Sequence, residues 1–139
     1  MNRIFIDTNI IIYANDARDP VKQKKAIEII KSIMINKNGT ISTQVLQEYA
    51  FVALSKLKQS QDVVLRQLKL LESLEVINQS ADQIRRAVEI RALYKIGFWD
   101  ACIISNAENS NCTAIYSEDL NTGQFYSGMQ IVNPLLPGF

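Results

Sequence analysis

The sequence predicts an α/β fold of three layers (α/β/α), in which helices cover both faces of a central parallel sheet of four to five strands. Short apolar segments with strand character alternate along the chain with longer segments of helical periodicity. A strand, a crossover helix and the next strand form a right-handed unit whose two strands run parallel, and such units build a layered α/β sheet. No internal repeat or linker is visible, so we expect a single domain over residues 1–139.

The predicted strands are short segments. Residues 3–7, Arg-Ile-Phe-Ile-Asp, are apolar enough to be buried on both faces, as the centre of a parallel sheet requires. Further strands are predicted at residues 40–42, 75–78 and 113–117, with a candidate fifth strand at 130–133. In parallel α/β sheets the active crevice lies beyond the carboxyl ends of the strands, where the strand order reverses. Polar residues that directly follow a strand are therefore the first candidates for function.

Start and stop signals define the intervening helices. Pro20 opens a helix that runs to about residue 35, and Gly39 lies beyond its end. Ser80 and Gln83 form a capping box for a helix to about residue 95, which Gly97 closes. The other predicted helices cover residues 43–57, 60–74 and 99–109, and a helical turn covers 10–14.

The residue types that are missing or rare narrow the chemistry. A content of 47% hydrophobic and 21% charged residues is that of an ordinary globular protein. The chain has no histidine, which excludes Ser-His-Asp and Cys-His catalysis, histidine-bound zinc and ribonuclease mechanisms that use imidazole as the proton carrier. The two cysteines, Cys102 and Cys112, match no zinc or redox motif and are expected to be reduced. Carboxylates, hydroxyls, lysines or metals must then do any catalytic work.

Charge is distributed unevenly along the chain. All 15 Lys and Arg residues lie between Arg3 and Lys95, whereas the only charged side chains in residues 96–139 are acidic. One interpretation of this asymmetry is that the protein binds a polyanion around a metal site. The other is a chance distribution over a solvated surface, and the charges favour neither interpretation over the other. No apolar run approaches the length of a membrane span and no signal-peptide pattern surrounds Asp7, so we expect a cytoplasmic protein without a membrane partner.

Two aspartates follow predicted strands. Asp7 ends the first strand, and Asp119 follows the fourth in Ser117-Glu118-Asp119. Each has a purely structural alternative, since Asp7 could cap the helical turn behind it and Asp119 could be a turn residue. Their position at the carboxyl ends of strands favours a functional site. Glu118 is expected to be a solvated neighbour that points away.

Two further carboxylates lie in apolar helical segments. Glu48 shares a helix face with Val45 and Tyr49, where a carboxylate is costly unless it is paired or bound to a cation. Asp100 lies in residues 98–104, which are apolar almost all round and predict a buried helix. The alternatives are a Glu48 that reaches water at the edge of the apolar stripe, and an Asp100 that only stabilises the first helical turn.

Together these four acids indicate a metal site. Glu48 and Asp100 lie on helices that can flank the sheet edge at which Asp7 and Asp119 follow their strands. Carboxylates brought close together repel one another, and hard, oxygen-preferring cations such as Mg²⁺ or Mn²⁺ relieve the repulsion. Because histidine is absent, such a cluster favours phosphoryl-transfer chemistry over zinc-dependent hydrolysis.

At these residues the sequence resembles the PIN-domain nucleases, and most closely the VapC-type toxins of bacterial and archaeal toxin–antitoxin pairs. The resemblance spans nearly the whole chain, and its motifs are individually short. They are Ile6-Asp7-Thr8-Asn9, Glu48 early in a helix, Gly97-Phe98-Trp99-Asp100-Ala101, Ser117-Glu118-Asp119 and the terminal Val132-Asn133-Pro134.

The resemblance implies a parallel sheet with its first and fourth strands adjacent at the centre. It also implies a homodimer that cleaves RNA and pairs with a cognate antitoxin protein. The implied active site is an acidic cluster for Mg²⁺ or Mn²⁺, made of Asp7, Glu48, Asp100 and Asp119. Within it, Asp7, Asp100 and Asp119 would hold the metal.

The resemblance also assigns supporting roles and leaves alternatives open. Asn9 and Ser117 would be polar supports that orient the carboxylates or the phosphate. Many relatives carry a further acid where this chain has Asn121, so a second metal ion would bind weakly or only with substrate. The fold also suits a non-toxin PIN nuclease of RNA maturation or decay, or an inactive module that binds RNA or protein. A phosphate-accepting receiver domain would need a late lysine, and none follows Lys95.

Overall fold

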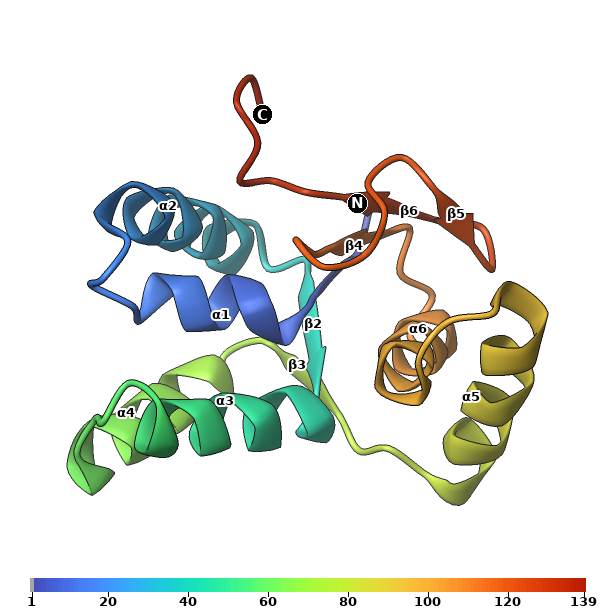
Figure 1. Ribbon diagram of the computed structural model, residues 1–139, viewed down its shortest axis with the longest axis horizontal. Helices are drawn as coiled ribbons and strands as arrows, with labels where there is room; N and C mark the ends of the chain where they lie inside the picture. The colour runs from blue at the N-terminus through green and yellow to red at the C-terminus, as the bar shows by residue number, and fades with distance from the viewer. Residues whose placement is uncertain (1) are drawn as a thin grey trace.

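The structure is a computed structural model that describes residues 2–139, and these residues form one sheet of six strands (Figure 1). The strands are β1 (Ile4–Ile6), β2 (Gly39–Ser42), β3 (Glu75–Ile77), β4 (Ala114–Tyr116), β5 (Phe125–Tyr126) and β6 (Met129–Val132). Their order across the sheet is β3-β2-β1-β4-β6-β5. All neighbouring pairs are parallel except β5 and β6, which form an antiparallel hairpin.

Helices cover both faces of this sheet. In Figure 1 the helices form two groups, one on each side of the sheet, which confirms the predicted three-layer α/β/α architecture. The first group is α1 (Thr8–Ala14), α2 (Pro20–Asn36), α3 (Thr43–Ser55) and α4 (Gln61–Leu71), and the second is α5 (Ala81–Tyr94) and α6 (Phe98–Asn109). Within residues 2–139, no helix is long and apolar enough to cross a membrane.

The centre of the sheet is formed by β1 and β4, as the resemblance implied. Ile4 pairs with Ala114 and Ile6 with Tyr116 in parallel register. From β1 the chain adds β2 and then β3 on one side of the sheet, and it then returns to add β4 and β6 on the other side of β1. The strand order therefore reverses between β1 and β4. By the rule for open α/β sheets, the crevice beyond the carboxyl ends of β1 and β4 is where a functional site is expected.

The sheet has one strand more than the four to five predicted. The candidate fifth strand is confirmed as β6, but β5 was not predicted, because two residues are too few to show an alternating pattern. Its signal lies in the turn: Ser127 and Gly128 both adopt positive φ, at 51° and 80°, as a tight antiparallel hairpin requires. The Ser127-Gly128 pair was therefore the feature of the sequence that could have predicted the hairpin of β5 and β6.

Two predicted helix ends differ from the structure. Gly97 does not close α5, because Lys95 takes the left-handed cap position with a φ of 56°, and Gly97 instead precedes α6 as its N-cap. The helix predicted to reach residue 74 ends at Leu71, where successive backbone turns lead into β3. The capping box of Ser80 and Gln83 at the start of α5 is confirmed.

Candidate active site

Asp7 leaves the central strand β1 and begins α1. It is only 5% exposed, and its backbone N–H still donates to the Tyr116 carbonyl of β4 at 2.9 Å. Its carboxylate caps α1, since Oδ1 accepts a hydrogen bond from the Thr8 N–H at 2.7 Å. Oδ2 accepts one from the Ser117 hydroxyl at 2.8 Å. Asp7 is thus a helix cap and a buried carboxylate between the two central strands at the same time.

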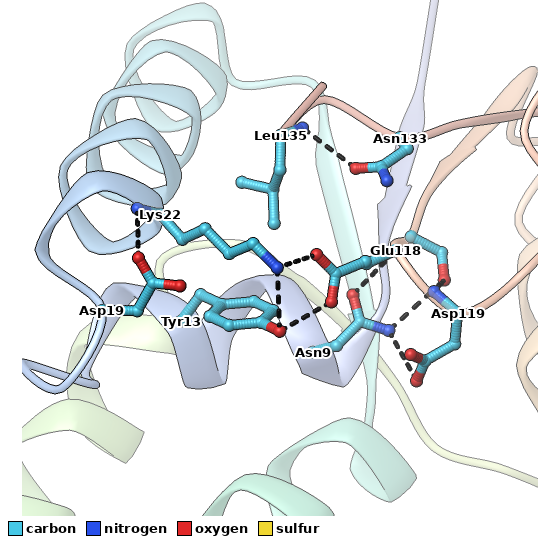
Figure 2. Close-up of polar contacts among 9 residues, drawn as sticks. Asn9, Tyr13, Asp19, Lys22, Glu118, Asp119, Asn133 and Leu135 are labelled. Atoms are coloured by element: carbon cyan, nitrogen blue, oxygen red, sulfur yellow. Dashed lines mark hydrogen bonds and ion pairs between the residues drawn. The ribbon is translucent and has the colours of Figure 1, made fainter. Parts of the chain in front are cut away.

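Asn9 and Ser117 connect the two aspartates that follow β1 and β4. The amide nitrogen of Asn9 lies 3.2 Å from Asp7 Oδ2. The same nitrogen lies 3.1 Å from Asp119 Oδ2, and the amide oxygen accepts from the Glu118 N–H at 3.0 Å (Figure 2). The Ser117 hydroxyl oxygen also accepts from the Asp119 N–H at 3.2 Å. These bonds fix both carboxylates relative to each other, and the supporting roles of Asn9 and Ser117 in catalysis stay a prediction.

All four predicted acids line a single cavity of about 160 Å³. Asp7 is buried, Glu48 and Asp100 are half-buried, and Asp119 is exposed at the rim. The acids come from four places in the chain, namely the ends of β1 and β4, the second turn of α3 and the first turn of α6. The other lining residues are Thr8, Asn9, Ile12, Gln44, Val52, Trp99 and Ile103, so the cavity as described contains no lysine or arginine.

Glu48 is held by two residues that the sequence analysis did not assign. Its Oε1 accepts hydrogen bonds from the Thr8 hydroxyl at 3.0 Å and from the Gln44 side-chain amide at 3.2 Å. Gln44 stands one helical turn before Glu48, at a spacing that brings helical side chains together. The spacing of Gln44 from Glu48 and the position of Thr8 next to Asp7 were the features of the sequence that could have indicated these two partners.

The electrostatics of the cavity disfavour full ionisation. The pKa of Asp7 is raised to about 6, chiefly by burial. Hydrogen bonds from Ser117 and Thr8 act to lower this pKa, and the charges of Asp100 and Glu48 act to raise it. Burial also raises the pKa of Asp100, and the charge of Asp119 adds to this. Like charges in a poorly solvated cavity account for both shifts.

This donor set fits a hard divalent cation. Every ionisable group in the lining is a carboxylate, which is the ligand type that Mg²⁺ and Mn²⁺ prefer. The Asp100 side chain accepts no hydrogen bond from any described residue, so a half-buried carboxylate stands without a partner. Across residues 2–139, no three acids or cysteines converge tightly enough to form a ready-made chelate. A cation would have to draw these side chains together, which its charge favours.

Glu118 points away from the cavity, as predicted, but it is not a solvated neighbour. It accepts hydrogen bonds from the Tyr13 hydroxyl at 2.6 Å and from the Lys22 ammonium at 2.7 Å (Figure 2). Burial works against ionisation of Glu118, but the bonds from Lys22 and Tyr13 outweigh it and lower its pKa. This ion pair ties the loop after β4 to α1 and α2.

The first turn of α6 is exposed at the edge of the site, and Asn121 lies outside the cavity. The segment 98–104 is not buried all round, because the start of α6 emerges at the sheet edge and leaves Trp99 66% exposed. Burial begins at Ala101 and continues to Ala107. Asn121 is exposed, donates to Gln124 at 3.2 Å and is not among the residues that line the cavity.

Comparison with known families identifies the class of protein. The sequence matches the PIN domain family over residues 4–126, and the chain therefore belongs to that family. The resemblance to PIN domains that the sequence indicated is thereby confirmed as a family relationship. A comparison with curated proteins gave no match. The catalytic roles of the individual residues stay a prediction.

Solved structures with the same fold include toxins of toxin–antitoxin pairs. A toxin–antitoxin complex from Klebsiella pneumoniae is similar with a TM-score of 0.72 and 22% identity, covering 94% of this chain and 97% of that chain. DNA-bound VapBC from Salmonella typhimurium gives a TM-score of 0.68 and 20% identity, with the same coverage of 94% and 97%. VapC20 of Mycobacterium tuberculosis, a toxin that cleaves the sarcin–ricin loop, gives 0.66 and 21%, with coverage of 84% and 89%. At these identities the likeness shows a shared fold.

Proposed function

We propose that this chain is a divalent-metal-dependent endoribonuclease and the toxin of a toxin–antitoxin pair, acting in the cytoplasm as a homodimer with a cognate antitoxin. The observation that carries the proposal is the one cavity lined by Asp7, Glu48, Asp100 and Asp119, beyond the carboxyl ends of β1 and β4. Membership of the PIN domain family supports the nuclease assignment. The likeness to structures described as VapBC and as a sarcin–ricin-loop-cleaving toxin supports RNA as substrate and an antitoxin as partner.

The residues of the chain prepare the site for metal and phosphate. Mg²⁺ or Mn²⁺, held by Asp7, Asp100 and Asp119, would supply the positive charge that lowers the pKa of a water and stabilises the phosphoryl transition state. Asn9 links Asp7 and Asp119 by donating toward both carboxylates. This link keeps the two aspartates near each other without the cation, which reduces the reorganisation that binding requires.

Glu48 is placed to accept a proton. The Thr8 hydroxyl and the Gln44 amide fix its Oε1, and no hydrogen bond from a described residue engages its Oε2. A carboxylate that is oriented through one oxygen and free at the other can take the proton of the attacking water. Because the chain has no histidine to activate the ribose 2′-hydroxyl, we expect hydrolysis that leaves a 5′-phosphate and a 3′-hydroxyl.

A cleavage assay with matched carboxylate-to-amide variants tests the proposal. The substrate is a structured RNA, incubated with purified protein in Mn²⁺ or in chelator. Asp100→Asn removes the unpartnered charge of the cavity and should reduce cleavage by at least about 100-fold, a usual effect of losing one electrostatic group of an active site. Glu72→Gln removes an exposed charge at the end of α4 and should leave the rate unchanged.

The outcomes separate the proposal from its alternatives. A wild-type protein that binds RNA but does not cleave it under any metal condition would be the inactive module. Cleavage without growth arrest on expression, across several hosts, would favour a nuclease of RNA maturation or decay. Equal rates for wild type and Asp100→Asn would place catalysis outside the acidic cavity.

A further inference from the structure

A second cavity adjoins the acidic one. Its volume is about 340 Å³, within the range of roughly 300–1,000 Å³ that is usual for small-molecule sites. It is lined by Gln44, Gln47, Glu48, Phe51, Val52 and Trp99. Four of these residues, Gln44, Glu48, Val52 and Trp99, line the acidic cavity too, so the two cavities share a wall.

Two exposed aromatic side chains line the second cavity. Trp99 is 66% exposed and Phe51 is 72% exposed, although both belong to residue types that folding normally covers. They come from the first turn of α6 and from α3, which are far apart in the sequence. The Phe98 ring stands edge-on to the Trp99 indole with 5.2 Å between ring centroids, so the indole is supported from one side.

Gln44 adds an unpartnered polar atom at the shared wall. Its side chain is 7% exposed, and its amide nitrogen donates to Glu48 and to the Trp99 carbonyl, each at 3.2 Å. Its amide oxygen is buried and has no hydrogen-bond partner among the described residues. A buried acceptor without a partner is costly, and a rotation of the Gln44 amide that turned it toward the N–H group of a ligand would remove the cost.

We propose that the second cavity binds an unpaired nucleobase of the RNA substrate, next to the phosphodiester held at the acidic cavity. This inference rests on the proposed function, because the acidic cavity defines where the phosphate lies. A phosphodiester carries a nucleoside on each side, so a flanking base must lie close to the acids. Stacking on exposed aromatic rings is a common way for proteins to hold bases of single-stranded RNA.

The chemistry of the cavity favours a base over other parts of RNA. Glu48 is the one charged residue in its lining as described, so a phosphate would meet repulsion there. A base is uncharged, has two apolar faces for Trp99 and Phe51, and carries N–H donors at its edge that can pair with the Gln44 amide once it rotates toward the cavity. The cavity therefore acts as a specificity subsite that selects RNA with an extruded base beside the cleaved bond.

Trp99 is the only tryptophan of the chain, so its fluorescence reports on this cavity directly. The first measurement uses the Asp100→Asn variant in Mn²⁺, which should cleave slowly and keeps Asp7 and Asp119 for the cation. It is titrated with a short single-stranded oligoribonucleotide and with an abasic ribose-phosphate of the same length. Stacking should quench the fluorescence with the base-containing oligomer and not with the abasic one. Equal responses to the two oligomers would mean that only the backbone is bound, and would overturn the proposal.

The second measurement compares variants by fluorescence anisotropy of labelled RNA and by kcat/KM for cleavage. Trp99→Ala and Phe51→Ala should each weaken RNA binding at least about fivefold, the low end of what one stacked base contributes. Trp99→Phe should recover part of the loss. Phe125→Ala, at an aromatic residue of β5 that is 59% exposed and absent from both linings, is the matched control and should bind as wild type.

The results distinguish this inference from the proposed function. If wild type cleaves RNA and Trp99→Ala cleaves and binds it equally well, the subsite is wrong while the nuclease stands. In that case the cavity would instead be interpreted as a site for a side chain of a protein partner. If wild type binds RNA through Trp99 but no metal supports cleavage, the subsite stands and the nuclease assignment fails.

Discussion

The carboxyl group of Asp7 should make the metal-free protein less stable as the pH rises. Its pKa is about 6 in the folded protein, against 3.8 for a free aspartate, and burial is the main cause. The folded state therefore binds this proton more tightly than the unfolded chain does. The stabilising effect is complete below about pH 4 and is lost as the pH rises through about 6. A difference of roughly 2 pKa units corresponds to about 3 kcal/mol of unfolding free energy.

Asp7→Asn isolates this contribution. The amide is uncharged at every pH, so the variant lacks the loss of stability between about pH 4 and pH 6. It also has a constant cost, because Asp7 Oδ2 accepts from both Ser117 and Asn9, and an amide NH₂ in its place would face donors. That cost does not change with pH. The informative quantity is therefore how the difference in melting temperature between variant and wild type changes with pH.

Thermal melts of both proteins in chelator, across about pH 4 to pH 7.5, measure this difference. For a domain of this length, about 3 kcal/mol corresponds to a relative shift of roughly 8–12 °C in favour of the variant as the pH rises. Glu72→Gln, at an exposed position, serves as the control and should show no such trend. A difference that stays constant over the whole pH range would refute the argument that burial and neighbouring charge keep Asp7 from ionising.

Three further changes give independent checks. Mn²⁺ at ten times its Kd should raise the wild-type melting temperature by roughly 3–6 °C, and Asp119→Asn should show a much smaller rise in the same melts. Asn9→Ala should lower kcat by at least about tenfold, because the two aspartates lose their bridge, while circular dichroism stays that of a folded protein. Gly39→Ala should reduce stability by about 1–3 kcal/mol in urea melts, since its Cβ would overlap the buried side chains of Ile33 and Leu74.

The periodic features of the sequence were sufficient to predict the layered fold. The apolar strand at β1 and the capping box at Ser80 depend on local side-chain chemistry, which sequence shows directly. The features of the fold that the sequence did not predict depend on tertiary contacts. Lys95 and Lys37 take the left-handed positions that end α5 and α2, although glycine is preferred there, because the chain must turn at those points to pack the next element. The two-residue strand β5 depends on its antiparallel pairing with β6, which a local stretch of sequence does not reveal.

The candidate site was predictable at the strand ends and less so on the helices. Asp7 and Asp119 follow strands that the sequence marks clearly, and topology brings the ends of β1 and β4 together. The partners of Glu48 were not predicted, because a hydrogen bond such as that from Thr8 joins residues 40 positions apart. The exposure of Trp99 was missed for a related reason, since an apolar segment does not reveal that its first turn extends past the sheet edge.

The central claim is that this acidic cavity hydrolyses RNA with the aid of a divalent cation. Determination of the product ends tests it most directly, with end-labelled RNA cleaved by the purified protein in Mn²⁺ and in chelator. The account predicts a 5′-phosphate and a 3′-hydroxyl, formed only in the presence of the metal, because water attacks the phosphate and no histidine activates the 2′-hydroxyl. Cyclic phosphate ends, or cleavage that continues in chelator, would contradict it.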